Sequence, residues 1–413
     1  MLKNKEGDMT PYNMSRKPVK QNPLLLPVIW GGSWLMTRPL HLKIEKKNMT
    51  GLKPPYLVLS THQGFSDYYI APLAMFPHRA AYVSDMEGFA AFGDWLYRNL
   101  GCIPKRRYVS DISVVRNMRH ALANRQSVVV FPESRHSNAG IAAKLPQNLG
   151  KLVRIMGAPL VVLSVNGSYL ANPFWDEEHT RKVPLRASME CIFTAEEVRK
   201  HTPEEIQLRI EQHLAYDEYR YQQENGILIT DGKRARGLHK VLYRCKSCKA
   251  KYHMESDDTT LRCKKCGAQW ELSQDGWLIN ADGKTHIPAW YAWERAMTPD
   301  EIGPQKFQVA VEALPNHKGF VPLGQGILQL DLDRFTLRIG GRTLEFPHKI
   351  RESVQTEYNY RGKGMCIVLS TWDCSYYIYS DDIRFQPTEL QFIGEYLYSV
   401  ARTPKMPIRS CPP

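Results

Sequence analysis

The sequence lacks a hydrophobic run long enough to cross a bilayer. Its most apolar stretch, residues 23–36, is fourteen residues long and is interrupted by a proline and a glycine pair, whereas a spanning helix needs about 20 apolar residues. A small-residue cleavage site is also missing, so a signal peptide is not expected. Acidic residues are scarce, because 42 Asp and Glu face 55 Lys and Arg, for a net charge of +13 at pH 7. That charge favours an anionic partner: phospholipid headgroups, nucleic acid or a phosphorylated substrate.

The cysteines do not form the pattern of a secreted, disulfide-bonded protein. There are nine in 413 residues; four stand in two C-x-x-C pairs and the others are scattered. This usage indicates a reducing, cytoplasmic setting. The length predicts two or three domains, and 43% hydrophobic residues are typical of folded protein.

The basic excess is concentrated near the N-terminus. Residues 1–53 hold ten Lys and Arg against three Asp and Glu, and they include the apolar stretch with Trp30 and Trp34. Apolar and aromatic side chains flanked by cations suit the edge of an anionic membrane. We therefore expect this segment to associate peripherally with the inner face of the membrane. The alternative is that it packs on the protein's own core.

Short apolar runs alternate with helical patterns between about residues 54 and 170. Strands are predicted at 56–60, 80–84, 127–131 and 160–165. Helices are predicted at 66–76, 89–100, 110–124 and 147–157, followed by a polar helix at 203–224. Such alternation indicates an α/β fold with a mostly parallel sheet and flanking helices. Functional groups are expected on loops that leave the strand ends.

From about residue 306 the pattern changes to alternating apolar and polar residues, which is typical of half-buried strands. A final helix is predicted at 388–402. A series of strands capped by one helix favours a β-rich domain, similar in pattern to pleckstrin-homology or GRAM domains.

The first predicted strand leads into T-H-Q-G-F-S-D at residues 61–67, and a helix follows. Gly64 permits a tight turn, across which Asp67 can reach one imidazole nitrogen of His62. That contact fixes the tautomer and leaves the other nitrogen free to take a proton from a hydroxyl, which is otherwise a poor nucleophile at neutral pH. A surface histidine followed by a helix cap would give the same spacing.

Three further blocks follow this H-x4-D pattern. Residues 101–107 read G-C-I-P-K-R-R, residues 131–137 read F-P-E-S-R-H-S, and another strand begins at A-P-L-V, residues 158–161. In this order the four blocks resemble the glycerolipid acyltransferase family, which includes the 1-acylglycerol-3-phosphate acyltransferases. That family's blocks are H-x4-D, G-x-I-x-x-x-R, F-P-E-G-T-R-S and a V-P-hydrophobic strand. The resemblance covers about residues 24–215.

The resemblance implies a role for each matching residue. His62 falls on the family's general base and Asp67 on its orienting partner. Arg107 falls on the arginine that binds the substrate phosphate, with Gly101 at the turn before it. Glu133 falls on a glutamate that helps hold the acceptor. The implied activity is transfer of a fatty acyl group from a thioester-type donor, such as acyl-CoA or acyl carrier protein, to the hydroxyl of a lysophospholipid or glycerol phosphate in phospholipid biosynthesis.

The cations around Arg107 agree with this assignment, because a phosphate with up to two negative charges needs a guanidinium fork or several cations. Lys105 and Arg106 add to that density. The third block departs from the family, since His136 fills the arginine slot and Arg135 stands one position earlier. Adjacent residues leaving a strand point in different directions, so either one can make the phosphate contact.

A second pattern predicts a metal site. Two C-x-x-C pairs, separated by fourteen residues, supply Cys245, Cys248, Cys263 and Cys266. Their spacing matches a four-thiolate zinc site on a ribbon of short strands. With all four positions filled by protein thiolates, the zinc is expected to be structural. The lysines around the pairs suit a solvated spacer, or a surface for nucleic acid or acidic lipid.

The predicted organisation combines these readings. The segments are 1–53 for membrane association, 54–224 as the acyltransferase domain, 225–242 as a linker, 243–272 as the zinc ribbon, 273–305 as a connection and 306–413 as the β-rich domain. The alternative function is an inactive, membrane-associated adaptor that binds a partner through the ribbon and the β-rich domain. A nucleic-acid partner is not expected, because it leaves the first half of the chain unexplained.

Overall fold

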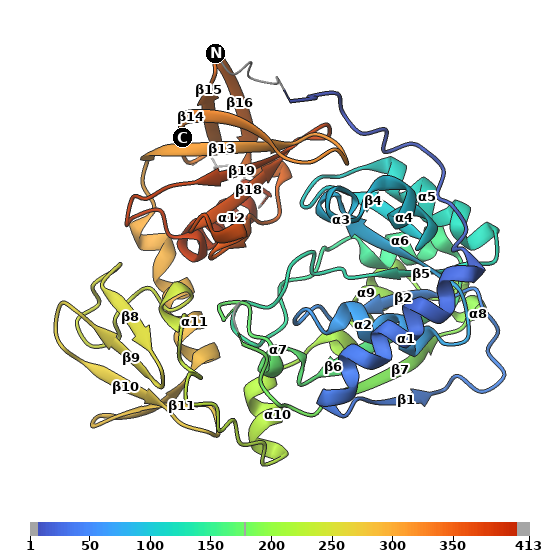
Figure 1. Ribbon diagram of the computed structural model, residues 1–413, viewed down its shortest axis with the longest axis horizontal. Helices are drawn as coiled ribbons and strands as arrows, with labels where there is room; N and C mark the ends of the chain where they lie inside the picture. Colours follow the sequence, from blue (N-terminus) through green and yellow to red (C-terminus); the bar gives the residue numbers. More distant parts are fainter. Residues whose placement is uncertain (1–6, 177–178, 403–413) are drawn as a thin grey trace, which may run out of the picture.

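The protein is described by a computed structural model that covers residues 7–176 and 179–402. Three sheets follow one another along the chain, and helices join and cover them (Figure 1). The expected first and last segments, 1–53 and 306–413, begin and end outside the described residues.

The first sheet has seven strands in the order β1-β7-β6-β2-β5-β3-β4. Neighbouring strands run parallel, except that β6 and β7 are antiparallel. The strands are β1 Lys43–Lys47, β2 Leu57–Ser60, β3 Ala80–Asp85, β4 Cys102–Lys105, β5 Ser127–Val130, β6 Leu160–Asn166 and β7 Arg186–Phe193. The predicted fold class, a mostly parallel sheet with flanking helices, is confirmed.

The central strands are buried on both faces, as their unbroken apolar runs predict. Val58, Val129 and Val161 belong to one buried cluster. Leu57, Val128 and Leu160 belong to the cluster on the opposite face. Alternate residues of β2, β5 and β6 thus enter different cores, as the period of two in a strand requires.

Helices cover this sheet and connect its strands. They are α1 Leu26–Thr37, α2 Asp67–Met75, α3 Met86–Phe92, α4 Asp94–Asn99, α5 Ile112–Ala123, α6 Leu149–Met156, α7 Ser168–Ala171, α8 Ala195–Lys200, α9 Pro203–Leu214 and α10 Glu218–Glu224. Two predicted helices are each divided into two. The helix expected at 89–100 breaks at Gly93, whose φ of +80° does not continue a helix. The helix expected at 203–224 ends at Leu214, and the Asp217 side chain caps a new one.

Strand β1 lies in the segment that was expected to precede the domain. Its sequence is K-I-E-K-K, and it pairs in parallel with β7 at the edge of the sheet. Charged side chains are common on edge strands, where they discourage pairing with other chains. Such a strand has no buried face to give it an apolar alternation, so the pattern does not reveal it.

A small antiparallel sheet forms the middle of the chain. We call residues 243–286, which comprise the two C-x-x-C pairs and this sheet, the ribbon. The order of the sheet is β12-β11-β10-β9-β8, with β8 Met254–Asp257, β9 Thr260–Cys263, β10 Gln269–Leu272, β11 Trp277–Asn280 and β12 Gly283–His286. The sheet therefore continues beyond residue 272, where the zinc ribbon was expected to end. Helix α11 Ile287–Met297 follows and packs Trp290 against Trp270.

The last sheet, with its helix, makes up what we call the C-terminal region, residues 305–402. Its seven strands are antiparallel in the order β16-β15-β14-β13-β19-β18-β17. The elements are β13 Gln305–Leu314, β14 Val321–Leu330, β15 Arg334–Ile339, β16 Arg342–Pro347, β17 Gln355–Glu357, β18 Cys366–Ser370, β19 Ser375–Tyr379 and α12 Pro387–Arg402. Apolar side chains of α12 join the core of the sheet, so the predicted β-rich fold with a capping helix is confirmed.

The C-terminal region packs directly against the first sheet and its helices. Met86, Phe89 and Cys102 form one buried cluster with Val368 and Tyr377. Figure 1 shows the C-terminal region (orange to red) beside α3 and β4. The two parts are therefore joined by an apolar contact and are not separated by a linker alone.

Within residues 7–176 and 179–402, no helix is long and apolar enough to cross a membrane. Helix α1 nevertheless exposes large apolar side chains: Val28, Trp34, Leu35 and Met36. Leu24, just before it, is also exposed.

Candidate active site

His62 lies in the turn between β2 and α2, and Asp67 is the first residue of α2. Both are buried, with 5% and 1% of their surfaces exposed. Asp67 Oδ2 lies 3.6 Å from His62 Nδ1 and accepts the backbone N–H of Gly64 at 3.1 Å. The turn folds this way because the backbone N–H of Gly64 donates to the Asp67 carboxylate, which anchors the start of α2. The predicted contact across the turn is therefore present, slightly longer than a hydrogen bond, as is common in sites without substrate.

Burial determines the charge states of this pair. It lowers the pKa of His62 to about 3, and the positive charge of Arg107 acts in the same direction. Burial also raises the pKa of Asp67 to about 6. At pH 7 the imidazole is thus neutral and the carboxylate is ionised. These are the states that a general base and its orienting partner need.

Glu133 holds the backbone of His62 in place. Its Oε1 accepts the backbone N–H of His62 at 3.0 Å, and its Oε2 accepts Ala143 N–H at 2.8 Å and the Tyr216 hydroxyl at 3.0 Å. Burial raises the pKa of Glu133 to about 7, although these donors oppose the shift. The resemblance implied contact with the acceptor. In the structure this carboxylate accepts hydrogen bonds from protein groups and holds the His62 turn against the loop after β5.

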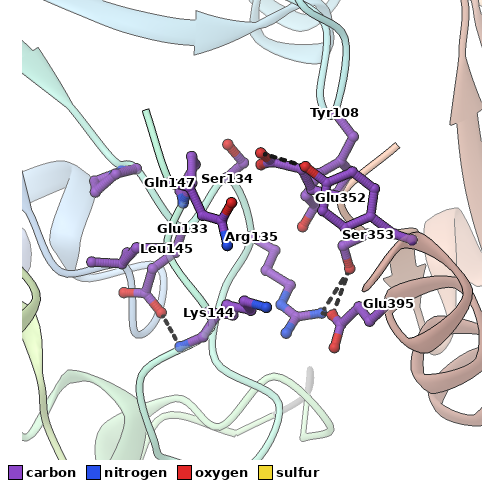
Figure 2. A pocket seen from close by; sticks show the side chains of 14 residues that line it. Tyr108, Glu133, Ser134, Arg135, Lys144, Leu145, Gln147, Glu352, Ser353 and Glu395 are labelled. Atoms are coloured by element: carbon purple, nitrogen blue, oxygen red, sulfur yellow. Dashed lines mark hydrogen bonds and ion pairs between the residues drawn. The ribbon is translucent and has the colours of Figure 1, made fainter. Parts of the chain in front are cut away.

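Arg135 and His136 point in different directions, as adjacent residues leaving a strand do. The His136 ring packs on the His62 ring, with 4.3 Å between centroids, and also contacts Phe65 and Phe174. Arg135 turns away and donates to Ser353 and Glu395 of the C-terminal region (Figure 2). Of the two candidates for the family's arginine slot, only His136 contacts His62.

Arg107 lies at the end of β4 and lines the same cavity as His62. Its guanidinium forms ion pairs with Asp85 and with Glu357, the latter at 3.4 Å. Burial opposes the positive charge, but Asp85, Glu87 and Glu357 outweigh it and hold the pKa of Arg107 well above its usual value. Arg107 lines the cavity beside His62, but its guanidinium is already paired with two carboxylates.

Gly101 and Arg106 have structural roles. Gly101 has a φ of +89°, and a Cβ at this position would meet the Ala80 carbonyl oxygen at 2.7 Å, so only glycine fits. Arg106 is buried and donates to the backbone carbonyls of Leu314, Pro315 and Asp373. It therefore links the first sheet to the C-terminal region, and it is not among the residues that line the His62 cavity.

A cavity of about 550 Å³ opens beside His62. Its near end carries Tyr68, Asp85, Lys105 and Arg107. The part of its lining that comes from α5 and α6 is mostly apolar, with Ile112, Val115, Met118, Leu149, Leu152 and Ile155, and it also includes Lys151. The cavity thus joins a polar end, next to the imidazole, to a mostly apolar part.

Several residues of the site were not predicted. The Tyr68 hydroxyl lies 3.4 Å from His62 Nε2, the nitrogen that faces away from Asp67. Asp85 follows a predicted strand and caps the next helix, a pattern that reads as a helix start and conceals its contact with Arg107. Tyr216 and Glu357 carry no local signal, because each reaches the site from a distant part of the chain.

The four cysteines of the two C-x-x-C pairs come together at one end of the ribbon. Their sulfur atoms all lie within 4.8 Å of one another; Cys245 and Cys266 are 3.7 Å apart, and Cys248 and Cys263 are 3.8 Å apart. Four thiolates at about 2.3 Å from a tetrahedral zinc ion are about 3.8 Å from one another. The cluster is thus of the right size to hold a metal ion.

The comparisons with known proteins locate the similarity in the first sheet. The chain matches the acyltransferase family model over residues 41–166. A solved structure, the 1-acyl-sn-glycerophosphate (LPA) acyltransferase PlsC from Thermotoga maritima, is similar over 46% of this chain and 80% of its own, with 20% identity and a TM-score of 0.35. No curated protein sequence matches. Residues 41–166, which contain His62, Asp67, Arg107 and Glu133, match the acyltransferase family model in the region where the four blocks predicted the resemblance.

Proposed function

We propose that this protein transfers a fatty acyl group from a thioester donor, such as acyl-CoA or acyl carrier protein, to the hydroxyl of a lysophospholipid or glycerol phosphate. The observation that carries the proposal is the neutral, buried His62. Its Nδ1 lies beside the Asp67 carboxylate, and the ring lines a cavity that also contains apolar side chains of α5 and α6. This arrangement supports a general base next to a site for an alkyl chain.

In the proposed reaction, His62 Nε2 removes the proton from the acceptor hydroxyl. The resulting alkoxide attacks the thioester carbonyl carbon, and the C–O bond forms. The tetrahedral intermediate then collapses, the C–S bond breaks, and His62 returns the proton to the leaving thiolate. Asp67 stabilises the transient imidazolium, as the carboxylate does in other acid–base pairs of this kind. Transfer is direct, with no acyl-enzyme intermediate.

The apolar end of the cavity is the proposed site for the alkyl chain. Burying a chain between α5 and α6 contributes about 0.8 kcal/mol for each methylene group. Met118, Leu149 and Leu152 line this end. A chain held there is fixed on the same side of the sheet as His62, which also lines the cavity.

Helix α1 is the proposed membrane contact. Val28, Trp34, Leu35 and Met36 are exposed on it, and Arg38 follows directly, with its guanidinium over the Trp34 ring. Exposed apolar side chains and a cation at one helix end suit insertion into a headgroup layer. Flotation with anionic vesicles checks this: Trp34→Ser with Leu35→Ser should abolish binding, while Leu208→Ser, an exposed leucine on α9, should not.

The four cysteines of the ribbon are proposed to hold a structural zinc ion. Their positions would all be occupied by thiolates, which leaves no coordination site for catalysis. Zinc would then contribute to folding of the ribbon and not to acyl transfer.

The test of the proposed function is an assay of the purified protein across a panel of lysophospholipids, glycerol 3-phosphate and acyl-CoA donors. Transfer is expected for the wild type and is expected to be lost in His62→Ala. His78→Ala is the matched control, because His78 is an exposed histidine after α2, and it should retain activity. Equal transfer by His62→Ala and the wild type would contradict the mechanism. Lack of transfer to every acceptor would favour the alternative, an inactive adaptor.

A further inference from the structure

Three arginines of the two basic blocks, Arg106, Arg107 and Arg135, are bonded to the C-terminal region. Arg106 donates to the Leu314 carbonyl oxygen at 2.9 Å and to the Ser375 hydroxyl at 3.1 Å. Arg107 is paired with Glu357, and Arg135 is paired with Glu395 at 3.0 Å. The C-terminal region therefore reaches the site itself and meets the very cations that the resemblance assigns to the substrate.

Arg107 is the only one of the three that lines the His62 cavity, so its charge balance decides what the cavity accepts. Asp85 pairs with it from β3, and Glu357 pairs with it from β17. Glu87 lies close by, where it accepts the Tyr377 hydroxyl at 2.6 Å. Two carboxylates in contact with one guanidinium leave no positive charge to neutralise a dianion.

A phosphate monoester in the cavity would lie next to the like charge of Asp85, and Glu357 would already be neutralising Arg107. Like charges placed together in a buried site cost several kcal/mol. Separating the carboxylates from Arg107 would deprive each of this charged partner inside the protein, which is also costly. Both routes disfavour an acceptor that ends in a free phosphate.

The exposed Lys151 on α6 lines the cavity, and Lys105 supplies a further cation to its polar end. The Lys105 ammonium donates to the Ser134 hydroxyl at 3.1 Å. Burial lowers the pKa of Lys105 to about 8, and Arg107 acts in the same direction, so the ammonium still carries its charge at pH 7. One such cation matches the single negative charge of a phosphodiester better than the two charges of a monoester.

We propose that Glu357 and Asp85 make this acyltransferase selective for lysophospholipids whose headgroup is a phosphodiester carrying hydroxyl or ammonium donors, and that they exclude phosphate monoesters. Donors on the headgroup pair with the Asp85 carboxylate at the cavity wall. Glu357 is a positioning residue that acts through Arg107. The inference rests on the proposed acyl transfer, and it names the acceptor class for that site.

The first test needs only the wild type. Its kcat/KM is measured for lysophosphatidylglycerol, lysophosphatidylethanolamine and lysophosphatidic acid, which share an acyl chain and differ in headgroup. The two diesters are expected to exceed the monoester by about tenfold or more. A wild type that uses the monoester as well as the diesters would overturn the inference and leave the proposed function standing. Absence of transfer to all three would overturn both.

The second test changes the charge of Glu357. Glu357→Gln is expected to lower KM for the monoester, so that the diester preference falls about fivefold or more. Glu357→Asp retains the charge and should retain the preference. Glu345→Gln is the matched control, because Glu345 lies on β16 in the same region and pairs with Arg334. An unchanged preference in Glu357→Gln would overturn the role of Glu357.

Discussion

The His62–Asp67 pair and the Arg107 cluster lie side by side but are built in different ways. The pair is held by the turn after β2 and by Glu133 after β5, so it belongs wholly to the first sheet. Arg107 is shared, with Asp85 on one side and Glu357 of the C-terminal region on the other. The proposed chemistry is therefore local to the first sheet, whereas the proposed choice of acceptor depends on how the two sheets pack.

Loss of the Asp67 charge should distinguish the His62–Asp67 pair from the Arg107 cluster most sharply. In Asp67→Asn the amide cannot stabilise the imidazolium, so kcat is expected to fall by about 10²–10⁴-fold, with selectivity among acceptors unchanged. Steady-state assays of acyl transfer with the acceptor panel check this. Asp217→Asn, at the cap of α10, is the control and should keep its kcat. Retention of wild-type kcat in Asp67→Asn would show that the pair is not the catalytic one.

Glu133→Gln should have an intermediate effect. The amide keeps the shape of the side chain but can turn an N–H toward the backbone N–H of His62 or of Ala143, which loosens the turn. We expect kcat to fall about tenfold to a hundredfold, without a change in acceptor preference. A change in preference without a loss of kcat would place Glu133 in the acceptor site, as the resemblance first implied.

The pH dependence of acyl transfer should follow the groups that hold the His62–Asp67 pair and not the Arg107 cluster. The pKa of Asp67 is raised to about 6, so protonation below that pH removes the charge that orients His62. His62 itself stays neutral, since its pKa is lowered to about 3. Protonation of Asp67 should therefore lower activity about tenfold per pH unit below about pH 6, and protonation of Glu133, whose pKa is raised to about 7, should add a smaller fall that begins near pH 7. If Asp67→Asn showed the same fall in activity below pH 6, the assignment of that fall to Asp67 would be wrong.

Metal removal should have the smallest effect on transfer. The ribbon contacts α12 where Lys251 and Tyr252 donate to Glu389, at 2.7 and 2.6 Å. A chelator, or Cys263→Ser, is expected to release zinc and lower Tm by roughly 5 °C or more, with a loss of activity of only about twofold to threefold. Cys191→Ser, in β7, should retain the metal. Metal analysis and thermal unfolding distinguish these outcomes.

The sequence was most informative where local pattern and burial coincide. The apolar strands β2, β3, β5 and β6 were predicted within a residue or two, because they are buried on both faces. Strand β7, Arg186–Phe193, was missed although its residues alternate in burial. Strands β1 and β4 were missed as well, since β1 is charged and β4 contains Pro104 and ends at Lys105. Neither gives the alternation or the apolar run that marks a strand.

The contacts of the site also differ in whether the sequence predicts them. The turn that brings Asp67 to His62 spans five residues, so the motif itself predicts the contact. Glu357 lies 250 residues beyond Arg107, and its contact depends on the packing of two sheets. No spacing encodes such a contact. The family's arginine could therefore be located from the sequence, but not the carboxylates that neutralise it.

The most direct test of a local chemistry with a shared specificity is a double-variant cycle of Glu133→Gln and Glu357→Gln. The wild type, both single variants and the double variant are assayed with lysophosphatidylglycerol and lysophosphatidic acid. Independent roles predict that the first change lowers kcat on both acceptors equally, that the second lowers the diester preference alone, and that the double variant shows the product of the two effects. If Glu133→Gln shifts the preference, or Glu357→Gln lowers kcat on the diester as far as Glu133→Gln does, the two functions are not separate and the account is wrong.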